Sequence, residues 1–251
     1  MINQFRIEFY KFRHLKVFWA AIAFVVLLAV FGWVVLRWSL VSEARNYSLN
    51  RDDLDSEFFL LMCDVSFILL YSMVTAWFIG NDLDNRTVCN EIALGYSRWT
   101  TLFSRILPCW CATVILHFVR FASFMSILWF VYGYGFYIPT FQIRDFVWLG
   151  VILLQLLAMQ SLVALITILS SNAIAAMVIS SVFTIIVNNV VHLILYSWEM
   201  EEGLRIWGTM FFALAQDNSD RTLITAGCMA VAAIAGVTAV TYCVFRKMEL
   251  K

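Results

Sequence analysis

Six long apolar stretches, separated by shorter polar segments, make up most of this 251-residue chain. The stretch at residues 17–36 contains no ionisable residue, so a water-soluble fold would have to bury it on every side. The others run at about residues 58–80, 106–132, 146–169, 173–196 and 223–245. Each is long enough to cross a bilayer as a helix. The pattern predicts an all-α polytopic membrane protein with six transmembrane helices, forming a single domain over residues 1–251.

The Lys and Arg residues between these spans predict the orientation, because positively charged loops resist export. Segments 1–16, 81–105, 170–172 and 246–251 together carry ten such residues, whereas segments 37–57, 133–145 and 197–222 carry six. The net charge of zero therefore divides into about +5 on one side and −5 on the other. Six spans also place both termini together. We expect a multi-pass protein of the plasma (cell) membrane, bacterial in origin, with both termini in the cytoplasm.

Composition excludes several kinds of function. With 63% apolar residues, the chain has no room for a soluble catalytic domain. Its glycines do not assemble a G-x-x-x-x-G-K-[ST] phosphate loop, so it does not bind ATP in that manner. We expect no cofactor or metal in this chain, and no nucleic acid as partner. The six cysteines lie in or beside spans and are interpreted as packing residues: Cys63, Cys89, Cys109, Cys111, Cys228 and Cys243.

The first sixteen residues are too polar to span a membrane and carry a helical pattern of apolar positions. One predicted face contains Ile2, Phe5, Phe9 and Phe12. The polar sector contains Glu8, Lys11, Arg13 and Lys16. This pattern favours an amphipathic helix in the cytoplasmic headgroup layer. The alternative is a positively charged flank that only orients the first span.

The segment between the second and third spans is the most distinctive, and residues 79–107 read IGNDLDNRTVCNEIALGYSRWTTLFSRIL. We expect Asp82 and Asp84 to cap a short helix that is interrupted at Gly95. Its apolar side would contain Val88, Ile92 and Leu94. Ser97 would cap the continuation into the third span. A short helix between two spans can carry a displacement from another protein to both, while the alternative is an ordinary solvated loop.

These residues resemble the type 2 ABC exporter permeases. That family has six spans, cytoplasmic termini, a connecting helix of the form E-x-x-K-x-x-R, and a coupling segment that reads E-F-x-x-x-T-x-x-N, then G-x-S-R and a basic residue. The first pattern is similar to Glu8, Lys11, Arg13, His14 and Lys16. The second is similar to Asp82, Leu83, Thr87, Asn90, Gly95, Ser97, Arg98 and Arg105. The chain departs from it in having Asp82 for Glu and Leu83 for Phe.

The resemblance implies a permease subunit that is not itself an enzyme. It implies two copies of a cytoplasmic ABC ATPase subunit, which bind ATP and Mg, and a second permease protomer that forms a homodimer. The segment at residues 81–105 would be the coupling segment. Its expected contacts with the ATPase are Asp82, Asp84, Arg86, Thr87, Asn90, Glu91, Tyr96 and Arg98.

Three ionisable residues lie at membrane depth, where an uncompensated charge is costly. Arg120 and His117 are three residues apart on one face of the third span, and Asp64 lies in the second span. Consecutive helices are commonly neighbours, so Arg120 can reach Asp64. Both a structural ion pair and a substrate-lining role remain open.

The fourth and fifth spans each carry a polar or small face. The fifth contains Ser181, Thr184, Asn188 and His192 within about 80 degrees of one another. The fourth contains Gln160, Ala164, Thr167 and Ser171. Such faces serve helix packing or line a pore. In the resembled family the fifth helices of two protomers face each other across the translocation path.

The small size of the polar segments between the spans suggests a class of cargo. Small permeases without large outer domains resemble those that export peptides or confer self-immunity and antimicrobial peptide resistance, so we expect an amphipathic or cationic peptide, such as a toxin or bacteriocin. The alternative cargo is a lipid, polysaccharide or drug. An intramembrane enzyme or a non-transporting signalling protein is the alternative of another class. Residues 201–205 approach a protease signature, but the spacing is one residue short and the required histidine motifs are missing.

Overall fold

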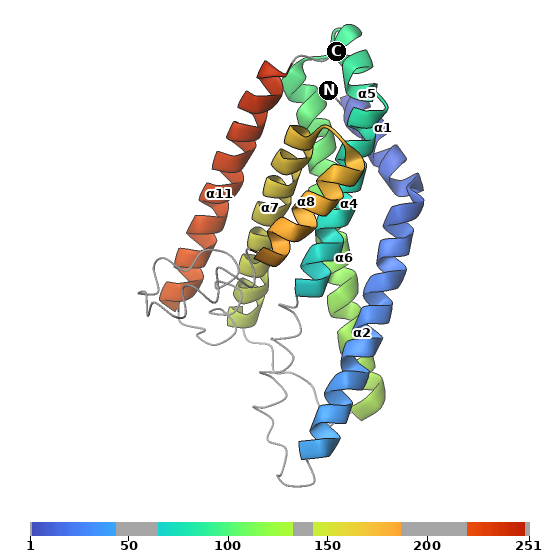
Figure 1. Ribbon diagram of the computed structural model, residues 1–251. Coiled ribbons are helices and arrows are strands. Elements are labelled where there is room, and N and C mark those ends of the chain that lie inside the picture. Colours follow the sequence, from blue (N-terminus) through green and yellow to red (C-terminus); the bar gives the residue numbers. More distant parts are fainter. Residues whose placement is uncertain (1, 44–64, 133–142, 187–219, 249–251) are drawn as a thin grey trace.

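The computed structural model describes residues 2–43, 65–132, 143–186 and 220–248, and all regular secondary structure there is helical (Figure 1). This confirms the all-α class. The helices are α1 (Ile2–His14), α2 (Lys16–Glu43), α4 (Val65–Asp84), α5 (Thr87–Ala93), α6 (Arg98–Tyr132), α7 (Ile143–Ser170), α8 (Ala173–Ile185) and α11 (Asp220–Lys247).

Several of these helices are long and apolar enough to cross a membrane. Three meet that requirement on their own: Arg98–Ser123, Leu149–Ser170 and Leu223–Lys247. A fourth is formed if Gln4–His14 and Lys16–Phe31, which are bent by 55°, cross together, and Ala173–Ile185 is a shorter apolar helix. The start of the predicted second span and the end of the predicted fifth span lie outside the described residues. The chain is thus a multi-pass membrane protein, while the six-span count stays a prediction.

Helices α4, α6 and α7 form the centre of the bundle, with α2, α8 and α11 around them. The largest packed surfaces join α7 to α11 and α4 to α8. The second of these depends on Gly80: a Cβ atom there would lie 2.6 Å from Cα of Ala173. Only a hydrogen side chain allows so close an approach, which small residues typically provide between membrane helices. Ala76 of α4 and Ala176 of α8 pack in the same region, together with Val163 of α7.

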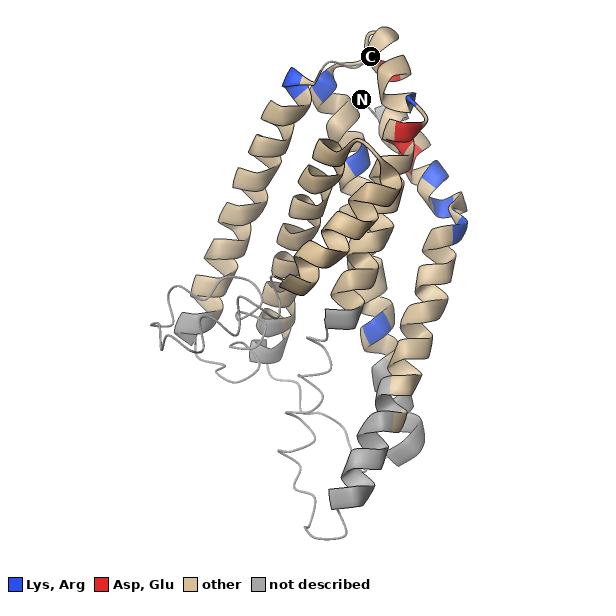
Figure 2. Ribbon diagram, in the orientation of Figure 1, with Lys and Arg blue, Asp and Glu red and all other residues tan. Residues whose placement is uncertain are grey.

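The described ends of the chain lie at one end of the bundle, together with α1, α5, the start of α6 and the end of α11 (Figure 1). Figure 2 shows that most of the Lys, Arg, Asp and Glu residues that it colours gather there, while a basic position lies deeper along α6. We call this region the charged end. Elsewhere, among the side chains that the structure describes, the bundle is mainly apolar but buries several uncharged polar residues, such as Gln155, Gln160 and Thr167.

A bend at Leu15 separates α1 from α2. The backbone turns through hydrogen bonds from N of Leu15 to O of Phe12 and from N of Phe18 to O of Leu15, both 3.1 Å. The indole nitrogen of Trp19 donates to O of Arg13 at 2.8 Å and so satisfies a terminal carbonyl of α1. These contacts fix α1 at an angle to the long apolar helix that follows.

The face that α1 turns inward differs from the sequence prediction. Glu8 is buried, whereas Phe9 is exposed. The inward face follows Gln4, Glu8 and Phe12 at intervals of one helical turn. The assignment of Glu8 to an exposed polar sector was therefore wrong, because basic residues of the charged end compensate its carboxylate.

Candidate functional site

A network of charged side chains joins four helices at the charged end. Its members are Glu8 and Lys11 of α1, Asp82 of α4, Glu91 of α5 and Arg105 of α6. We call these five residues the ion cluster. All except Lys11 are largely buried, so the two cations compensate the three carboxylates in part, with little help from water.

Arg105 is the centre of the ion cluster. Its Nη1 and Nη2 atoms donate to the two carboxylate oxygens of Glu91 at 3.0 Å and 2.9 Å, which is the bidentate geometry favoured by guanidinium and carboxylate. Its Nε atom lies 2.9 Å from a carboxylate oxygen of Asp82. A further hydrogen bond to O of Thr101, at 2.9 Å, holds the side chain against its own helix. One guanidinium thus ties α5 and α4 to the beginning of α6.

Helix α1 joins the ion cluster through three side chains. Nε2 of Gln4 donates to Glu91 at 2.7 Å. Nζ of Lys11 donates to Glu8 at 2.7 Å and lies 4.0 Å from Asp82. The shared partners mean that α1 cannot move away from α5 without breaking a charged hydrogen bond.

The carboxyl groups of Glu8 and Glu91 respond oppositely to their surroundings. Burial raises the pKa of Glu8 above its usual value, and Lys11 and Arg105 offset that effect only in part. Burial also acts to raise the pKa of Glu91. There, the hydrogen bonds from Arg105 and Gln4 and the charge of Arg105 outweigh it, and the pKa lies below its usual value.

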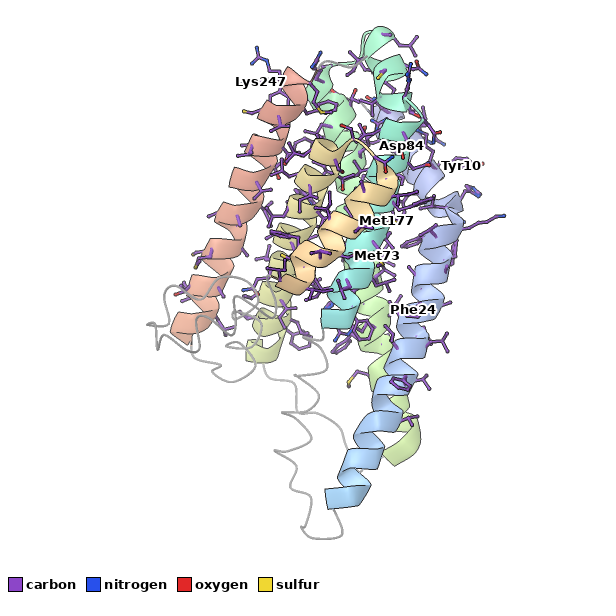
Figure 3. The ribbon with its side chains drawn as sticks, viewed as in Figure 1. Tyr10, Phe24, Met73, Asp84, Met177 and Lys247 are labelled. Atoms are coloured by element: carbon purple, nitrogen blue, oxygen red, sulfur yellow. The ribbon has the colours of Figure 1, made fainter. Side chains whose placement is uncertain are left out.

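The segment at residues 85–97, which we call the elbow, begins differently from the sequence prediction. Asp82 and Asp84 end α4 and do not cap α5. The residue before α5 is Arg86, whose backbone is left-handed (φ 55°) and which forms no side-chain cap. Asp82 is instead held by Arg105, and Asp84 accepts a hydrogen bond from N of Ala173 at 2.9 Å. Asp84 therefore satisfies a backbone N–H at the start of α8, in addition to the N-cap Asn172, at the junction visible in Figure 3.

The other end of the elbow agrees with the sequence prediction. Oγ of Ser97 accepts a hydrogen bond from N of Thr100 at 3.2 Å, so Ser97 caps α6. Gly95 has a φ of 91°, a conformation that glycine adopts without strain. Both residues allow the chain to leave α5 and enter α6 within a few positions.

Arg98 connects α6 to the last helix. Its Nη1 atom donates to the carbonyl oxygens of Phe245, Arg246 and Met248 at 3.2, 2.6 and 3.1 Å. A cation at the C-terminus of a helix satisfies free carbonyls and interacts favourably with the helix dipole. Trp99 packs on Tyr242 beside this contact, with ring centroids 4.8 Å apart.

The surface of the elbow mixes polar and apolar groups. Val88 is buried, and Ile92 packs against the core from a half-buried position, as predicted. Leu94, which was expected beside them, is instead 78% exposed, because α5 ends at Ala93 and the chain turns outward there. Tyr96 is also exposed.

The eight residues predicted to contact an ATPase therefore divide into two groups. Asp82, Asp84, Glu91 and Arg98 have partners within the chain, described above. Arg86, Asn90 and Tyr96 are exposed on the elbow, and Thr87 is half-buried. The second group leaves its side chains available to another protein.

Of the three ionisable residues predicted at membrane depth, the structure describes two. His117 and Arg120 are both buried on one face of α6. The guanidinium carbon of Arg120 lies 3.7 Å from the centre of the Phe67 ring, a cation–π contact. Arg120 also interacts with Tyr71 of α4. Asp64 lies outside the described residues, so its pairing with Arg120 stays a prediction.

The polar faces of the fourth and fifth spans lie largely inside the bundle. Gln160, Ala164, Thr167 and Thr184 are buried, Ser181 is half-buried, and Ser171 is exposed in the turn between α7 and α8. The hydroxyl oxygens of Thr184 and Ser72 are 3.4 Å apart across α8 and α4. This contact favours helix packing for that part of the face. Asn188 and His192 lie outside the described residues, as do residues 197–219.

Sequence patterns missed three residues of this region. Gln4 donates to Glu91 of the ion cluster. Its spacing of four from Glu8 places both on one face of α1 and could have indicated this role. Gly80 permits the contact between α4 and α8, although a single glycine in an apolar run does not identify its neighbour. Phe67 was indistinguishable from other apolar residues of its span.

Comparison with known proteins decides the class. The family model described as "ABC-2 family transporter protein" matches residues 4–188. The chain belongs to the ABC-2 transporter family. Comparisons with curated proteins and with solved structures gave no match.

The matched range contains most of α1, the elbow, the whole ion cluster and the polar face of the fourth span. It contains all of the polar face of the fifth span except His192. Membership in this family makes the chain an ABC-2 type permease and implies an ABC ATPase as its partner. The resemblance seen in the sequence is thereby confirmed.

Proposed function

We propose that this ABC-2 permease exports an amphipathic or cationic peptide, such as a toxin, bacteriocin or antimicrobial peptide. It would work as a homodimer with two copies of a separate cytoplasmic ATPase. In this proposal the chain has six spans, both termini and the charged end are in the cytoplasm, and α1 lies in the cytoplasmic headgroup layer. Helix α5 is the coupling helix.

The observation that carries the proposal is the linkage of α5 to its neighbours. Glu91 of α5 binds Arg105 of α6 through two hydrogen bonds, and Arg105 also pairs with Asp82 of α4. A force applied to α5 would therefore reach the helices on both sides of the elbow as a rigid-body displacement, a recurring form of switching transition.

Two further contacts extend this linkage beyond the elbow. Asp84, at the end of α4, binds the start of α8. Arg98, at the start of α6, binds the end of α11. Helix α8, which carries the described part of the polar face of the fifth span, and the last predicted span are thus connected to the segment on which an ATPase would act.

The exposed part of the elbow provides a surface for that ATPase. Leu94 and Tyr96 are exposed apolar and aromatic residues of this surface. Arg86 and Asn90 are exposed polar residues of the same elbow. Aromatic and Arg side chains often contribute most of the binding free energy at protein interfaces. ATP-driven closure of the ATPase subunits would then move this surface.

The peptide cargo is supported by charge and by the absence of a large polar domain in the sequence. The predicted outer segments have a net charge of about −5, which attracts a cationic substrate. Within the bundle, His117, Arg120, Ser181 and Thr184, with Asp64, Asn188 and His192 from outside the described residues, are candidates for a polar path.

The proposal is tested by co-purification of an ATPase with the full chain from its own membranes. In the double variant R86E/Y96A, the amount of ATPase that co-purifies should fall by about tenfold or more relative to the natural chain. Loss of interface hot spots typically costs about 2 kcal/mol or more of binding free energy. The chain itself should remain folded, since both side chains are exposed.

Lys247→Glu is the matched control, because Lys247 is another exposed basic residue of the charged end and lies on α11. It should retain the ATPase. Equal retention by the double variant and the natural chain would contradict the contact at the elbow, and failure of the natural chain to retain any ATPase would contradict the assignment as an ATP-driven permease.

A further inference from the structure

Helix α1 presents two chemically different faces. Its inward face joins the ion cluster through Gln4, Glu8 and Lys11. Its outward face, together with the first residues of α2, contains the exposed basic residues Arg6, Arg13 and Lys16. The burial of Glu8 removes the only acidic residue of α1 from the surface.

Aromatic and apolar groups accompany these exposed charges. Ile7, Phe9, Tyr10 and Trp19 are all exposed, and Figure 3 shows Tyr10 projecting from the outer side of α1. Basic residues beside aromatic rings are typical of segments at a membrane–water interface, where the rings lie at headgroup level. The bend at Leu15 holds this surface beside the start of the apolar helix α2.

We infer that the outward face of α1 is a docking surface for anionic phospholipid headgroups. The inference rests on the proposed placement of α1 in the cytoplasmic headgroup layer, and adds the class of lipid that it selects. Each Lys or Arg near an anionic membrane surface increases affinity about fivefold. Three such residues without an exposed acidic residue on the same helix give selection for anionic over zwitterionic lipid.

The lipid surface and the ion cluster are opposite sides of the same helix. Lys11 lies between them, with its side chain 37% exposed while it binds Glu8. Anionic headgroups that hold α1 against the membrane would therefore also hold Gln4 next to Glu91. The charge of the membrane leaflet thus favours the assembled ion cluster.

The acidic residues of α4 and α5 at the charged end bind other groups of the chain. Asp82 and Glu91 are paired with Arg105, and Asp84 binds the start of α8. An anionic partner approaching α1 therefore meets basic groups and indole or phenol rings.

The inference is tested by quenching of Trp19 fluorescence with brominated lipids in vesicles that contain the full chain. The vesicles hold the same mixture of phosphatidylglycerol and phosphatidylcholine, with bromine on one lipid or the other. Subtracting the signal of a Trp19→Phe variant isolates the response of Trp19. We expect stronger quenching by brominated phosphatidylglycerol, and weaker preference as salt screens the charges.

In the triple variant R6Q/R13Q/K16Q, the preference for phosphatidylglycerol over phosphatidylcholine should fall by about tenfold or more. This is expected because three basic residues are removed and each contributes about fivefold to the affinity for anionic lipid. The double variant R246Q/K247Q, which removes exposed basic residues from α11 of the charged end, should retain it. Size-exclusion profiles show whether each variant is folded.

Each other outcome overturns a defined part of the inference. Equal quenching by both lipids would show that the surface formed by α1 and the start of α2 does not select anionic lipid. No quenching by either would show that the bend between α1 and α2 is not at the membrane surface, which contradicts the proposed placement of α1. Equal loss in the α11 control would show a general effect of net charge.

Discussion

The charged end and the membrane-embedded part of this permease satisfy their polar groups in different ways. At the charged end, Glu91, Arg105 and Asp84 bond to residues of other helices. Deeper in the bundle, hydroxyl groups bond mainly to carbonyls of their own helix, as Thr113, Ser161 and Thr167 do at 3.0, 2.9 and 2.7 Å.

This difference separates two sources of structural specificity. Bonds between helices define which elements lie together, and they are lost when one helix moves. A hydroxyl that bonds to the residue four positions earlier places no condition on its neighbours. In the embedded part, close approach of small residues such as Gly80 and Ala173 has to specify the arrangement instead.

The largest effect on stability is expected from removing Arg105. Arg105→Ala would leave the carboxylates of Glu8, Asp82 and Glu91 buried together without the guanidinium. Breaking a buried ion pair on one side typically costs about 3 to 5 kcal/mol. Denaturant unfolding in detergent, followed by circular dichroism, measures this loss.

Arg86→Ala is the control for that variant. It removes an exposed Arg from the adjacent elbow, where surface substitutions usually change stability by less than about 0.5 kcal/mol. A similar, small loss in both variants would mean that the ion cluster does not stabilise the charged end.

A smaller loss is expected at Gly80. Gly80→Ala would place a methyl group 2.6 Å from Cα of Ala173, so α4 and α8 must separate. Overpacking of this kind typically costs about 1 to 3 kcal/mol. The same unfolding experiment measures it.

Gly150 of α7 is the matched control, because a Cβ atom there meets nothing within 4 Å. Gly150→Ala should stabilise the helix by up to about 1 kcal/mol, as alanine has the higher helix propensity. If the two substitutions change stability in the same direction, close packing at Gly80 does not specify the arrangement of α4 and α8.

The smallest effects are expected from neutralising single carboxylates, and their signs differ. The raised pKa of Glu8 means that the folded chain binds its proton more tightly than the unfolded chain, so its contribution to stability is lost as pH rises through the folded pKa. The stability of Glu8→Gln relative to the natural chain should therefore increase as the pH rises from acidic to neutral, because Gln does not titrate.

Glu91 has the opposite shift. Its lowered pKa contributes stability above the usual value near 4.5, and that contribution is lost as pH falls through the folded pKa. Glu91→Gln should therefore be less stable than the natural chain at neutral pH and approach it in acid. Unfolding curves measured across this pH range give the stability of each variant relative to the natural chain. We expect this difference to change with pH in opposite directions for the two variants. The same pH dependence in both would contradict the electrostatic description of the ion cluster.

Sequence patterns predicted the helices better than the contacts between them. Apolar runs identified α7 and α11 to within three residues at each end, because each run is continuous along the chain. The start of α2 was also predicted to within one residue, but α2 continues seven residues beyond the predicted end at position 36. Arg105 pairs with Asp82 and Glu91, and Glu8 joins the same cluster through Lys11, but no local pattern brings these positions together. The same holds for Asp84, which has the character of a cap for the next helix in sequence but binds a backbone N–H at the start of α8.

The start of α6 shows where local chemistry was sufficient. Ser97 was predicted as its cap, and it forms that hydrogen bond within its own segment. Burial of Glu8 was not predictable in this way, since a carboxylate at that position is compatible with solvent until Lys11, Asp82 and Arg105 are known to surround it.

The central claim is that the bond between Glu91 and Arg105 transmits the movement of the elbow to the membrane helices. The most direct test compares the natural complex with Glu91→Gln in inside-out vesicles, recording ATP hydrolysis and uptake of a fluorescent cationic amphipathic peptide together. The variant retains the exposed surface of the elbow but loses the charge that binds Arg105. We predict continued hydrolysis with at least about fivefold less peptide transported per ATP, the lower range of typical coupling free energies. An unchanged ratio of transport to hydrolysis would contradict this account.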